Sequence, residues 1–344
     1  MKLEELELLS SLKEFNFAPE LLSFLPEPIR RFSQNQPDCF VLEGAERRFG
    51  LWMYAGQEED LRCQLEILDL FHEGGFEGFL YPIQLADGSR YAQVDPRSWF
   101  FVTAWPELRK VRFCDPQSLS GWVELIAKIR KIVAFNRAEI MRWVPEKSKG
   151  LNLLETIQSM IANIHSFALL AKYRIRPTRF DRLFLAHVDD ILSWAERAYQ
   201  VLRDNTYPNG RQEPESNTFL LHKFLRRNFG KREDGSLICL NIKKWRWDLA
   251  IMDLAELLVK AGRSNQWQRA WYDSIMNAYQ RHFAVTDLEQ RMLIGYLMFP
   301  WDLFRVAQKY YFNLSAWSHY DFIIKLERRL AVEAKRQDFL KRFL

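Results

Sequence analysis

The sequence predicts an α+β fold in which a small β-rich N-terminal region precedes a larger, mostly α-helical region. Short runs of aromatic and β-branched residues alternate with turn residues up to about residue 102. Apolar residues spaced three and four apart then dominate the chain to its end. The length of 344 residues and a composition of 48% hydrophobic and 27% charged residues are ordinary for a globular protein of about two domains. We therefore predict two regions, residues 1–104 and 105–344.

The N-terminal region is predicted to contain strands and one long helix. Residues 1–24 favour one or two short helices that end before the helix-breaking Pro26 and Pro28. A turn is expected from Ser33 to Asp38, and Gly44 sits between two runs that form a hairpin. Apolar residues between 61 and 71 indicate a helix, which ends at the following glycine pair. The predicted strands are residues 39–43, 49–54, 91–94 and 99–102.

The C-terminal region is predicted to be helical except for a short β segment. Asp115 and Pro116 form a typical helix start, and Thr286 with Glu289 has the spacing of a capping box. A strand is expected at 218–221, a hairpin at 234–243 and a helix opening at Asp248. The remaining helices are predicted near residues 122–133, 152–168, 184–202, 267–282, 287–298, 301–311 and 316–343.

Composition also limits the classes of partner and cofactor. The net charge of +5, from 49 basic and 44 acidic residues, is a small excess of positive charge. It does not indicate the concentrated basic face that nucleic-acid-binding proteins carry. The four cysteines lack Cys-x-x-Cys spacing, so neither a zinc site nor a redox pair is expected, although cross-linking in an assembly stays open. The first 15 residues lack the features of a secretion signal. The longest apolar run, residues 292–301, is half the ~20 residues that a membrane helix needs, so no membrane insertion is expected.

The stretch from Leu220 to Leu258 contains the pattern most specific for a family. Bacterial phosphotransferases of the aminoglycoside and choline kinase type carry His-x-Asp-x-x-x-x-Asn, a hairpin ending in Ile-Asp-x-Asp, and Asp-Leu-Ala on a helix. This stretch resembles theirs in order and spacing. His222 and the sequence Asp253-Leu254-Ala255 match that pattern letter for letter.

Separated segments extend this resemblance through most of the chain. Thr178-Arg179-Phe180-Asp181 is similar to a Thr-x-Phe-Asp element, and Tyr296 to Pro300 with Tyr310-Tyr311 is similar to a Tyr-Leu-x-Phe-Pro motif and a tyrosine pair. Together these motifs resemble the CotS family of spore coat proteins, a branch of the kinase fold. The resemblance implies a two-lobed protein-kinase-like, aminoglycoside phosphotransferase-like fold, with a small β-rich N-lobe and a large helical C-lobe.

The resemblance also indicates which positions would carry kinase chemistry, and most of these hold other residues. In the loop at 222–229, the position of the catalytic-base Asp is Phe224, and the metal-binding Asn falls on Phe229, with Asn228 one residue early. In the hairpin at 234–243, the metal-binding Asp is replaced by Asn241 and the second acid by Lys243.

The N-terminal region departs from the kinase pattern in the same way. Glycines let backbone N–H groups approach phosphates, but none occurs between Ser33 and Asp38. Trp52 stands where the resemblance places the phosphate-binding Lys, and an indole cannot neutralise a phosphate. Glu66 lies where the partner of that Lys would be, although a solvated acid on a helix surface is the more common use of such a residue.

These substitutions predict a pseudokinase without catalytic, cofactor-binding or metal-binding residues. Phosphoryl transfer depends on metals, basic groups and an orienting acid around the transferred phosphate. His222 and Asp253 are then expected to have structural roles near the loop. The resemblance implies a binding or scaffold component of coat assembly during sporulation, made in the mother-cell cytoplasm and deposited in the spore coat. It also implies other spore coat proteins as partners, while the oligomeric state stays open.

Two alternatives remain at this point. The chain could be an active small-molecule phosphotransferase that uses displaced residues such as Asn228, Asp234 and Asp248. It could instead be a sensor that binds a small ligand in the former nucleotide cleft. The sequence leaves open whether that cleft is filled by Trp52, Phe224 and other aromatic residues.

Overall fold

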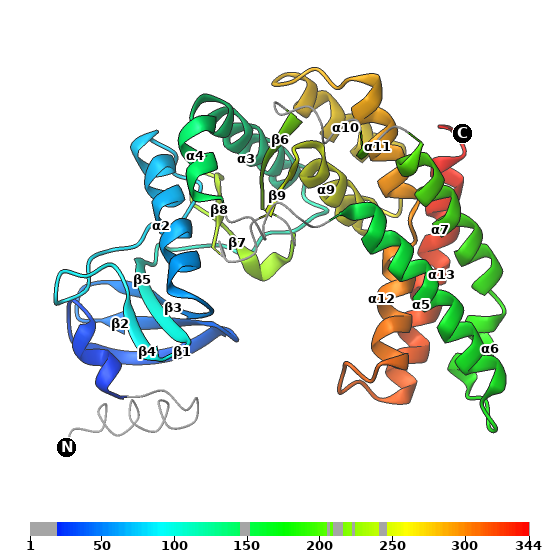
Figure 1. Cartoon of the computed structure of the whole chain (residues 1–344), viewed down its shortest axis with the longest axis horizontal. Coiled ribbons are helices and arrows are strands. Elements are labelled where there is room, and N and C mark those ends of the chain that lie inside the picture. The colour runs from blue at the N-terminus through cyan, green and yellow to red at the C-terminus, as the bar shows by residue number, and fades with distance from the viewer. Residues whose placement is uncertain are drawn as a thin grey trace. The chain divides into compact units, whose positions relative to one another are not determined.

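A computed structural model describes residues 19–144, 152–204, 207–208, 216–221, 224–240 and 246–343 (Figure 1). The chain forms two compact units. The first falls within Met1–Arg112, Lys131–Glu146 and Leu225–Trp245, and the second within Phe113–Arg130, Lys147–Phe224 and Arg246–Leu344. The division predicted from sequence follows chain order, whereas these units group the segment after residue 224 with the N-terminal sheet. The helices predicted before residue 19 lie outside the described residues.

The first unit is built on a five-stranded antiparallel sheet in the order β1-β2-β3-β5-β4. The turn predicted from Ser33 to Asp38 is shorter than expected, because β1 continues to Gln36, which pairs with Cys39. Each of the four predicted strands is present within one or two residues of its expected bounds. The strands are β1 (Ile29–Gln36), β2 (Cys39–Gly44), β3 (Arg48–Ala55), β4 (Ala92–Asp95) and β5 (Ser98–Ala104).

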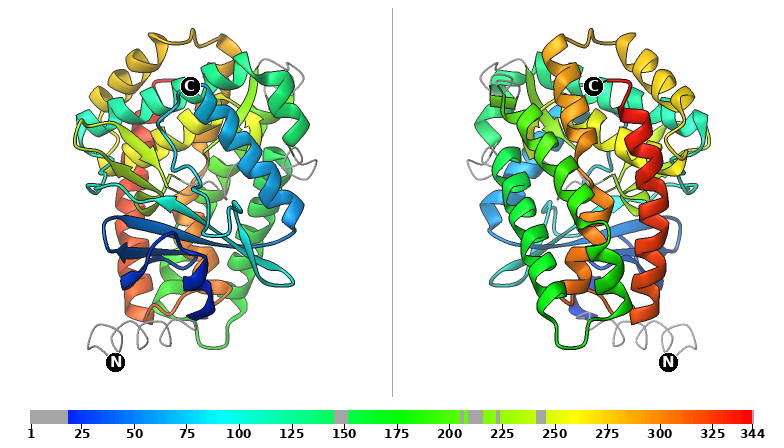
Figure 2. Two further views of the ribbon diagram at one scale, coloured as in Figure 1. Left: turned by 90° about the vertical axis from the view of Figure 1, so that its left-hand side faces the viewer. Right: turned by 90° about the vertical axis from the view of Figure 1, so that its right-hand side faces the viewer.

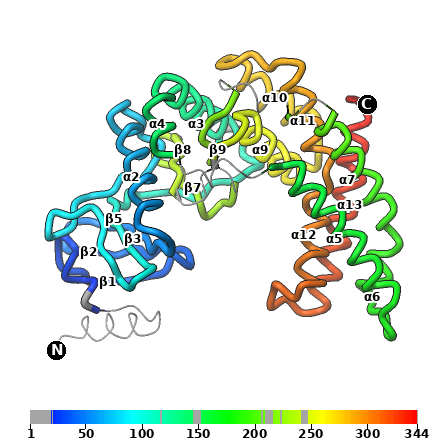
Figure 3. Tube along the Cα trace, viewed as in Figure 1, coloured from blue at the N-terminus to red at the C-terminus, as the bar shows by residue number. Residues whose placement is uncertain are grey.

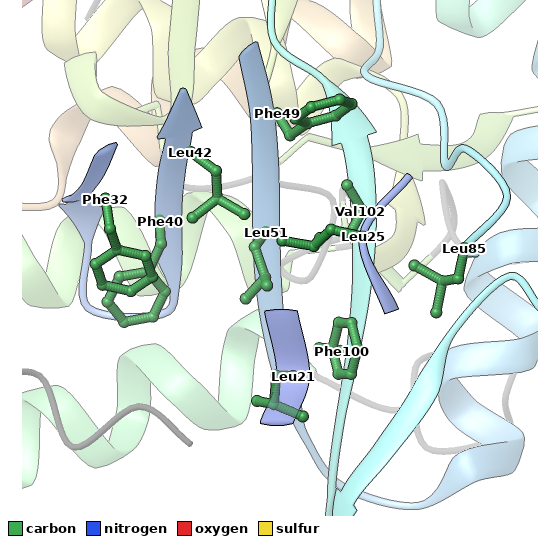
Figure 4. Packing of buried hydrophobic residues seen from close by; sticks show 10 residues of the cluster. All are labelled: Leu21, Leu25, Phe32, Phe40, Leu42, Phe49, Leu51, Leu85, Phe100 and Val102. Carbon is green, nitrogen blue, oxygen red and sulfur yellow. The ribbon is translucent and has the colours of Figure 1, made fainter. Parts of the chain in front are cut away.

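One face of this sheet carries an apolar core of its own (Figure 4). The alternation of side chains along strands puts every second residue on this face, and the 3-10 helix η1 (Pro19–Phe24) adds Leu21. Phe32 and Phe40 stack with ring centroids 4.8 Å apart. The cluster consists of Leu21, Leu25, Phe32, Phe40, Leu42, Phe49, Leu51, Leu85, Phe100 and Val102.

The helix α2 (Glu58–Glu73) spans the predicted apolar stripe and ends at Gly74. It contacts α4 (Arg137–Trp143). Burial, followed by the nearby Asp60 and Cys63 of α2, raises the pKa of Tyr54 to about 12, so the Tyr54 side of β3 faces this helix. Residues on that side, including Trp52, belong to a second buried layer.

A hairpin of β7 (Phe229–Lys231) and β8 (Leu237–Cys239) completes the first unit. Two backbone hydrogen bonds join Arg109 and Lys231, with N to O distances of 2.8 and 3.0 Å. Cys239 donates its N–H to the carbonyl oxygen of Gly78 at 2.8 Å. The hairpin predicted at 234–243 begins earlier, at Phe229, with Asp234 and Gly235 in its turn, and it is tied to the segments that follow β5 and α2.

The second unit consists mainly of helices (Figures 2 and 3). Side chains cap several of them: Thr286 and Glu289 form the predicted capping box, and Thr178 with Asp181 forms another. α12 packs against both α5 and α13. The helices are α3 (Pro116–Phe135, of which residues 116–130 belong here), α5 (Leu153–Tyr173), α6 (Arg179–Leu185), α7 (Val188–Arg203), α9 (Ile251–Ser264), α10 (Arg269–Gln280), α11 (Asp287–Met298), α12 (Trp301–Tyr311) and α13 (His319–Leu340).

Two predictions for this unit were wrong. Asp248 does not open a helix: β9 (Arg246–Leu249) pairs with β6 (Asn217–Leu220), and the helix begins at Ile251. Pairing with β6 holds Asp248 and Leu249 in a strand, although the apolar spacing of the sequence around them predicts a helix. The single helix predicted at 184–202 is divided at residues 186–187 into α6 and α7. No described helix combines the length and the apolar character needed to cross a bilayer.

Candidate functional site

Trp52 is buried within the first unit, at the position where the resemblance places a phosphate-binding lysine. It lies in β3 between Cys39 of β2 and Phe101 of β5, so it is central in the sheet. Its indole Nε1 donates a hydrogen bond to Thr103 Oγ1 at 3.2 Å. The indole polar group is therefore satisfied inside the protein, and the ring contributes apolar surface instead of charge.

Trp105, directly after β5, extends this aromatic layer over Gly50. Its ring centroid lies 6.2 Å from that of Trp52, and the Phe101 ring lies 6.4 Å from Trp52 on the same layer. A Cβ atom on Gly50 would come within 2.7 Å of the Trp105 ring. Only glycine therefore allows the indole to approach β3 so closely. We call Trp52, Phe101 and Trp105 the tryptophan layer.

The turn between β1 and β2 is joined to the segment where the resemblance places the catalytic loop. Gln36, the last residue of β1, is buried, and its Nε2 donates a hydrogen bond to the carbonyl oxygen of Arg227 at 2.7 Å. Arg227 belongs to the 3-10 helix η4 (Arg226–Asn228). The Gln36 side chain thus occupies the space between this turn and η4. Neither Gln36 nor Arg227 belongs to a recognisable sequence motif, so the sequence alone does not predict this hydrogen bond.

Asn228 and Phe229 are both buried in the first unit. Asn228 ends η4, and its carbonyl oxygen accepts a hydrogen bond from Leu240 N at 2.8 Å. Phe229 begins β7 and pairs with Cys239. These backbone contacts give Phe229 a place in the hairpin and in the core, where an apolar ring is favoured over a metal ligand. His222, Asn241 and Lys243 lie outside the described residues.

Glu66 pairs with an arginine from the same unit. Its Oε1 lies 3.4 Å from Arg90 Nη1, and the same guanidinium lies 2.8 Å from Asp69. Both acids are partly exposed on α2. Glu66 therefore behaves as a solvated acid of the helix surface, the more common of the two uses that the sequence allowed.

Phe224 and Asp253 belong to the second unit. Phe224 is fully buried, and its ring centroid lies 5.2 Å from that of Trp122 in α3. Asp253 is buried in α9, and its Oδ2 accepts a hydrogen bond from the backbone N–H of Leu221 at 2.7 Å. An aromatic ring thus fills the position where the resemblance places the catalytic base, and Asp253 holds the chain just before it.

Asp234 and Asp248, the acids that an active phosphotransferase could use instead, both accept hydrogen bonds within the protein. Asp234 Oδ1 accepts hydrogen bonds from Ser236 N and Oγ at 2.8 and 2.7 Å, as expected for the acid of a tight turn. Asp248 accepts from the Tyr207 hydroxyl at 3.1 Å and lies on β9 of the second unit.

A pocket of about 230 Å³ lies in the second unit beside Asp248. Its walls come from α5, α9, α11 and α12 and from the paired strands β6 and β9. They combine three charged side chains with apolar and aromatic ones. The lining includes Met160, Asp248, Met252, Glu256, Tyr296, Trp301 and Arg305.

Lys260 lies on α9 one turn beyond Glu256 and is almost fully buried. Burial, and then the nearby Arg305 and Arg263, lowers the pKa of Lys260 to about 8. Among the described residues none forms an ion pair with it, whereas Arg263 pairs with Asp302 at 3.0 Å. Nothing in the sequence indicates this buried ammonium, because its helical position resembles that of any surface lysine. Across the described residues, no three His, Cys, Asp or Glu side chains gather as a metal site.

The sequence from residue 164 to residue 343 matches the model of the family described as "Spore coat putative kinase YutH". No curated protein sequence matches the chain significantly. The family match lies mostly in the second unit, also spans residues 225–245 of the first unit, and includes the segments at 178–181, 296–300 and 310–311 that carried the resemblance.

Solved structures share the fold of the whole chain. An aminoglycoside phosphotransferase from Alicyclobacillus acidocaldarius superposes with a TM-score of 0.81 at 16% identity, covering 94% of this chain and 95% of that one. The spectinomycin phosphotransferase APH(9)-Ia in its AMP-bound form gives 0.68 at 12% identity, covering 92% and 96%. Choline kinase LicA from Streptococcus pneumoniae gives 0.53 at 10% identity, covering 95% and 99%. The predicted kinase-like α+β fold is therefore confirmed.

Proposed function

Because the chain belongs to the family of the spore coat putative kinase YutH, we propose that it is a catalytically inactive, kinase-like component of the spore coat. In this proposal it acts as a binding or scaffold protein during coat assembly. It is made in the mother cell and deposited in the coat, where its partners are other coat proteins.

The contact between Gln36 and Arg227 carries the proposal of inactivity. A kinase needs open space between the turn that covers the phosphates and the catalytic loop, because the phosphates and their metal ions lie there. Here a buried side chain crosses that space and hydrogen-bonds to the loop at 2.7 Å. Trp52 adds a second reason, because its ring places no cation beside a phosphate.

Thermal unfolding in the presence of magnesium-ATP tests whether the protein binds a nucleotide, as an active kinase would. A ligand that binds only the folded state adds about 2.7 kcal/mol of stability at a hundredfold excess over Kd. We expect no change in Tm at millimolar ATP or ADP. The spectinomycin phosphotransferase, solved in complex with ADP and spectinomycin, is a suitable positive control. A reproducible rise of several degrees for this chain would contradict the proposal and favour an enzyme or a nucleotide sensor.

A genetic experiment separates a scaffold from an enzyme with displaced catalytic residues. We expect spores that carry Asp234→Asn with Asp248→Asn to keep the coat-protein profile of the parent strain, while deletion of the gene alters it. The amount of variant protein in the coat fraction is the control for stability. A deletion-like coat in spores that contain normal amounts of the variant would instead support the phosphotransferase reading.

The pocket beside Asp248 supports a second candidate function, binding of a small amine. Asp248 and Glu256 supply negative charge, and Tyr296 with Trp301 supplies aromatic faces that suit an organic cation. Calorimetric titration with choline and with a primary amino alcohol tests this, with Glu256→Gln as the matched variant. Equal heats for the variant and the parent chain would exclude this pocket as the site.

A further inference from the structure

Large apolar side chains are exposed together at one end of the second unit. Of the eight that are exposed in the described part of the chain, seven belong to two short segments. One segment is the end of α5 and the turn that follows it, and the other runs from the end of α12 into the first turn of α13. We call them the apolar tip: Leu169, Leu170, Tyr173, Ile175, Phe312, Leu314 and Tyr320.

The two segments of the apolar tip lie against each other. The rings of Phe167 and Phe312 are 5.2 Å apart, edge to face. The Tyr310 hydroxyl is 2.9 Å from Thr178 Oγ1 and accepts from Arg174 Nη1 at 3.1 Å. Figure 3 shows the ends of α5 and α12 at the same end of this unit. The two segments that carry the exposed side chains therefore meet at the same end of this unit.

A buried framework holds this surface in place. Asp181 is completely buried, closes the capping box with Thr178 and pairs with Arg174 at 3.0 Å. The Tyr311 hydroxyl donates to the same carboxylate at 3.1 Å. The rings of Phe180 and Tyr310 stack with centroids 3.9 Å apart. The apolar side chains are thus held in solvent by packed, hydrogen-bonded neighbours.

Most of the charged side chains in the first segment of the apolar tip are basic, and one of them, Arg179, pairs with Glu327 at 2.8 Å. Between residues 167 and 185 there are five basic residues and one acid, and that acid is the buried, paired Asp181. Beside Phe322, the ammonium groups of Lys309 and Lys325 lie 4.5 and 4.4 Å from the Trp317 ring centroid. The five basic residues are Lys172, Arg174, Arg176, Arg179 and Arg182.

We propose that the apolar tip is a peripheral binding site for an anionic lipid surface. Ile175 is 97% exposed in a turn between Arg174 and Arg176, so its side chain projects away from the protein with a cation on each side. A side chain in such a position enters the acyl boundary of a bilayer while the neighbouring cations contact the headgroups. Tyr173 is suited to the same interface through its amphipathic ring.

Charge and shape together favour lipid over a protein partner. Hot spots of protein interfaces lie in packed pockets at the centre of a patch. Ile175, in contrast, stands in a turn, and the residues on either side of it in the chain, Arg174 and Arg176, are both basic, Arg174 being also paired with the buried Asp181. Such a contact lies on the membrane surface and needs no spanning helix.

Flotation of the full-length chain with lipid vesicles tests the proposal. We expect binding to phosphatidylcholine vesicles that contain about 30% phosphatidylserine, at least tenfold weaker binding to phosphatidylcholine alone, and weakening at high salt. Ile175→Glu should reduce binding to the anionic vesicles by about tenfold or more, and Arg176→Glu should also reduce it. Both positions are exposed, so the Tm of each variant should equal that of the parent.

Matched substitutions elsewhere make the result specific. Phe135→Glu changes the eighth large apolar residue that is exposed in the described part of the chain, 91% exposed in the first unit, and Lys128→Glu changes an exposed lysine of α3. Both should leave vesicle binding unchanged. Equal binding to neutral and anionic vesicles, or equal losses for Ile175→Glu and Phe135→Glu, would overturn the proposal. So would retention on an immobilised acidic polypeptide without any vesicle binding, since that result identifies a protein partner.

Discussion

Substituting Phe224 by Asp would introduce the acid that the resemblance expects at the position of a catalytic base, and we expect this change to destabilise the protein. The Phe224 ring is fully buried and lies 5.2 Å from the ring of Trp122. Removing a buried phenylalanine ring costs about 3 to 5 kcal/mol in a protein core. A carboxylate in that space must also lose its hydration or take up a proton.

The loss of unfolding free energy is the sum of these two costs, and it depends on how far the neighbouring side chains can move into the space that the ring leaves. We expect a loss of at least about 4 kcal/mol for Phe224→Asp, a large fraction of the 5 to 15 kcal/mol by which proteins of this kind are stable. Phe224→Leu keeps most of the apolar volume and should cost about 1 to 1.5 kcal/mol. Phe135→Asp, at an exposed phenylalanine, should change stability by less than about 0.5 kcal/mol.

Urea unfolding followed by tryptophan fluorescence measures these differences, and ATP hydrolysis is measured on the same samples. The order Phe224→Asp, then Phe224→Leu, then Phe135→Asp in decreasing loss is the expected result. Equal stability of Phe224→Asp and the parent chain would show that the site is hydrated and open. Measurable turnover in that variant would show that the catalytic machinery is nearly complete, and the inactive reading would then be wrong.

Three further substitutions test the roles of Trp52, Lys260 and Asp253. Trp52→Lys should cost less than Phe224→Asp, because a lysine can lay its stem along the apolar layer and carry its ammonium to water; urea unfolding of the single variants decides this. Lys260→Met should raise stability at pH 7 by about 3 kcal/mol, the equivalent of a pKa lowered from 10.5 to about 8. The folded state binds fewer protons than the unfolded state between these two pKa values, so the cost of burying the ammonium is complete below about pH 8 and fades toward pH 10.5. The gain in stability should therefore be clearly smaller at pH 9.5 than at pH 7, as measured by urea titrations at both pH values. Asp253→Ala should cost about 1 to 3 kcal/mol by leaving the Leu221 N–H without its acceptor, and hydrogen exchange at that amide should accelerate.

The sequence by itself determined the fold class, the family and most of the elements. The strands at 39–54 and the helices of the second unit follow from local periodicity, which depends only on which residues share a face. The capping box of Thr286 and Glu289 is also local, because its hydrogen bonds join residues three positions apart. The family resemblance rested on short motifs that keep their spacing along the chain.

Only the tertiary structure decided how the substituted positions are used. The sequence identified Trp52 and Phe224 as replacements, but burial against Thr103 and Trp122 depends on strands and helices that are distant in the chain. Local apolar spacing gave a helix at Asp248, whereas pairing of β9 with β6 made it a strand. The Gln36 contact joins residues 191 positions apart through one amide and one backbone carbonyl. A hydrogen bond between such common groups leaves no pattern in a sequence, because almost any residue can supply the carbonyl.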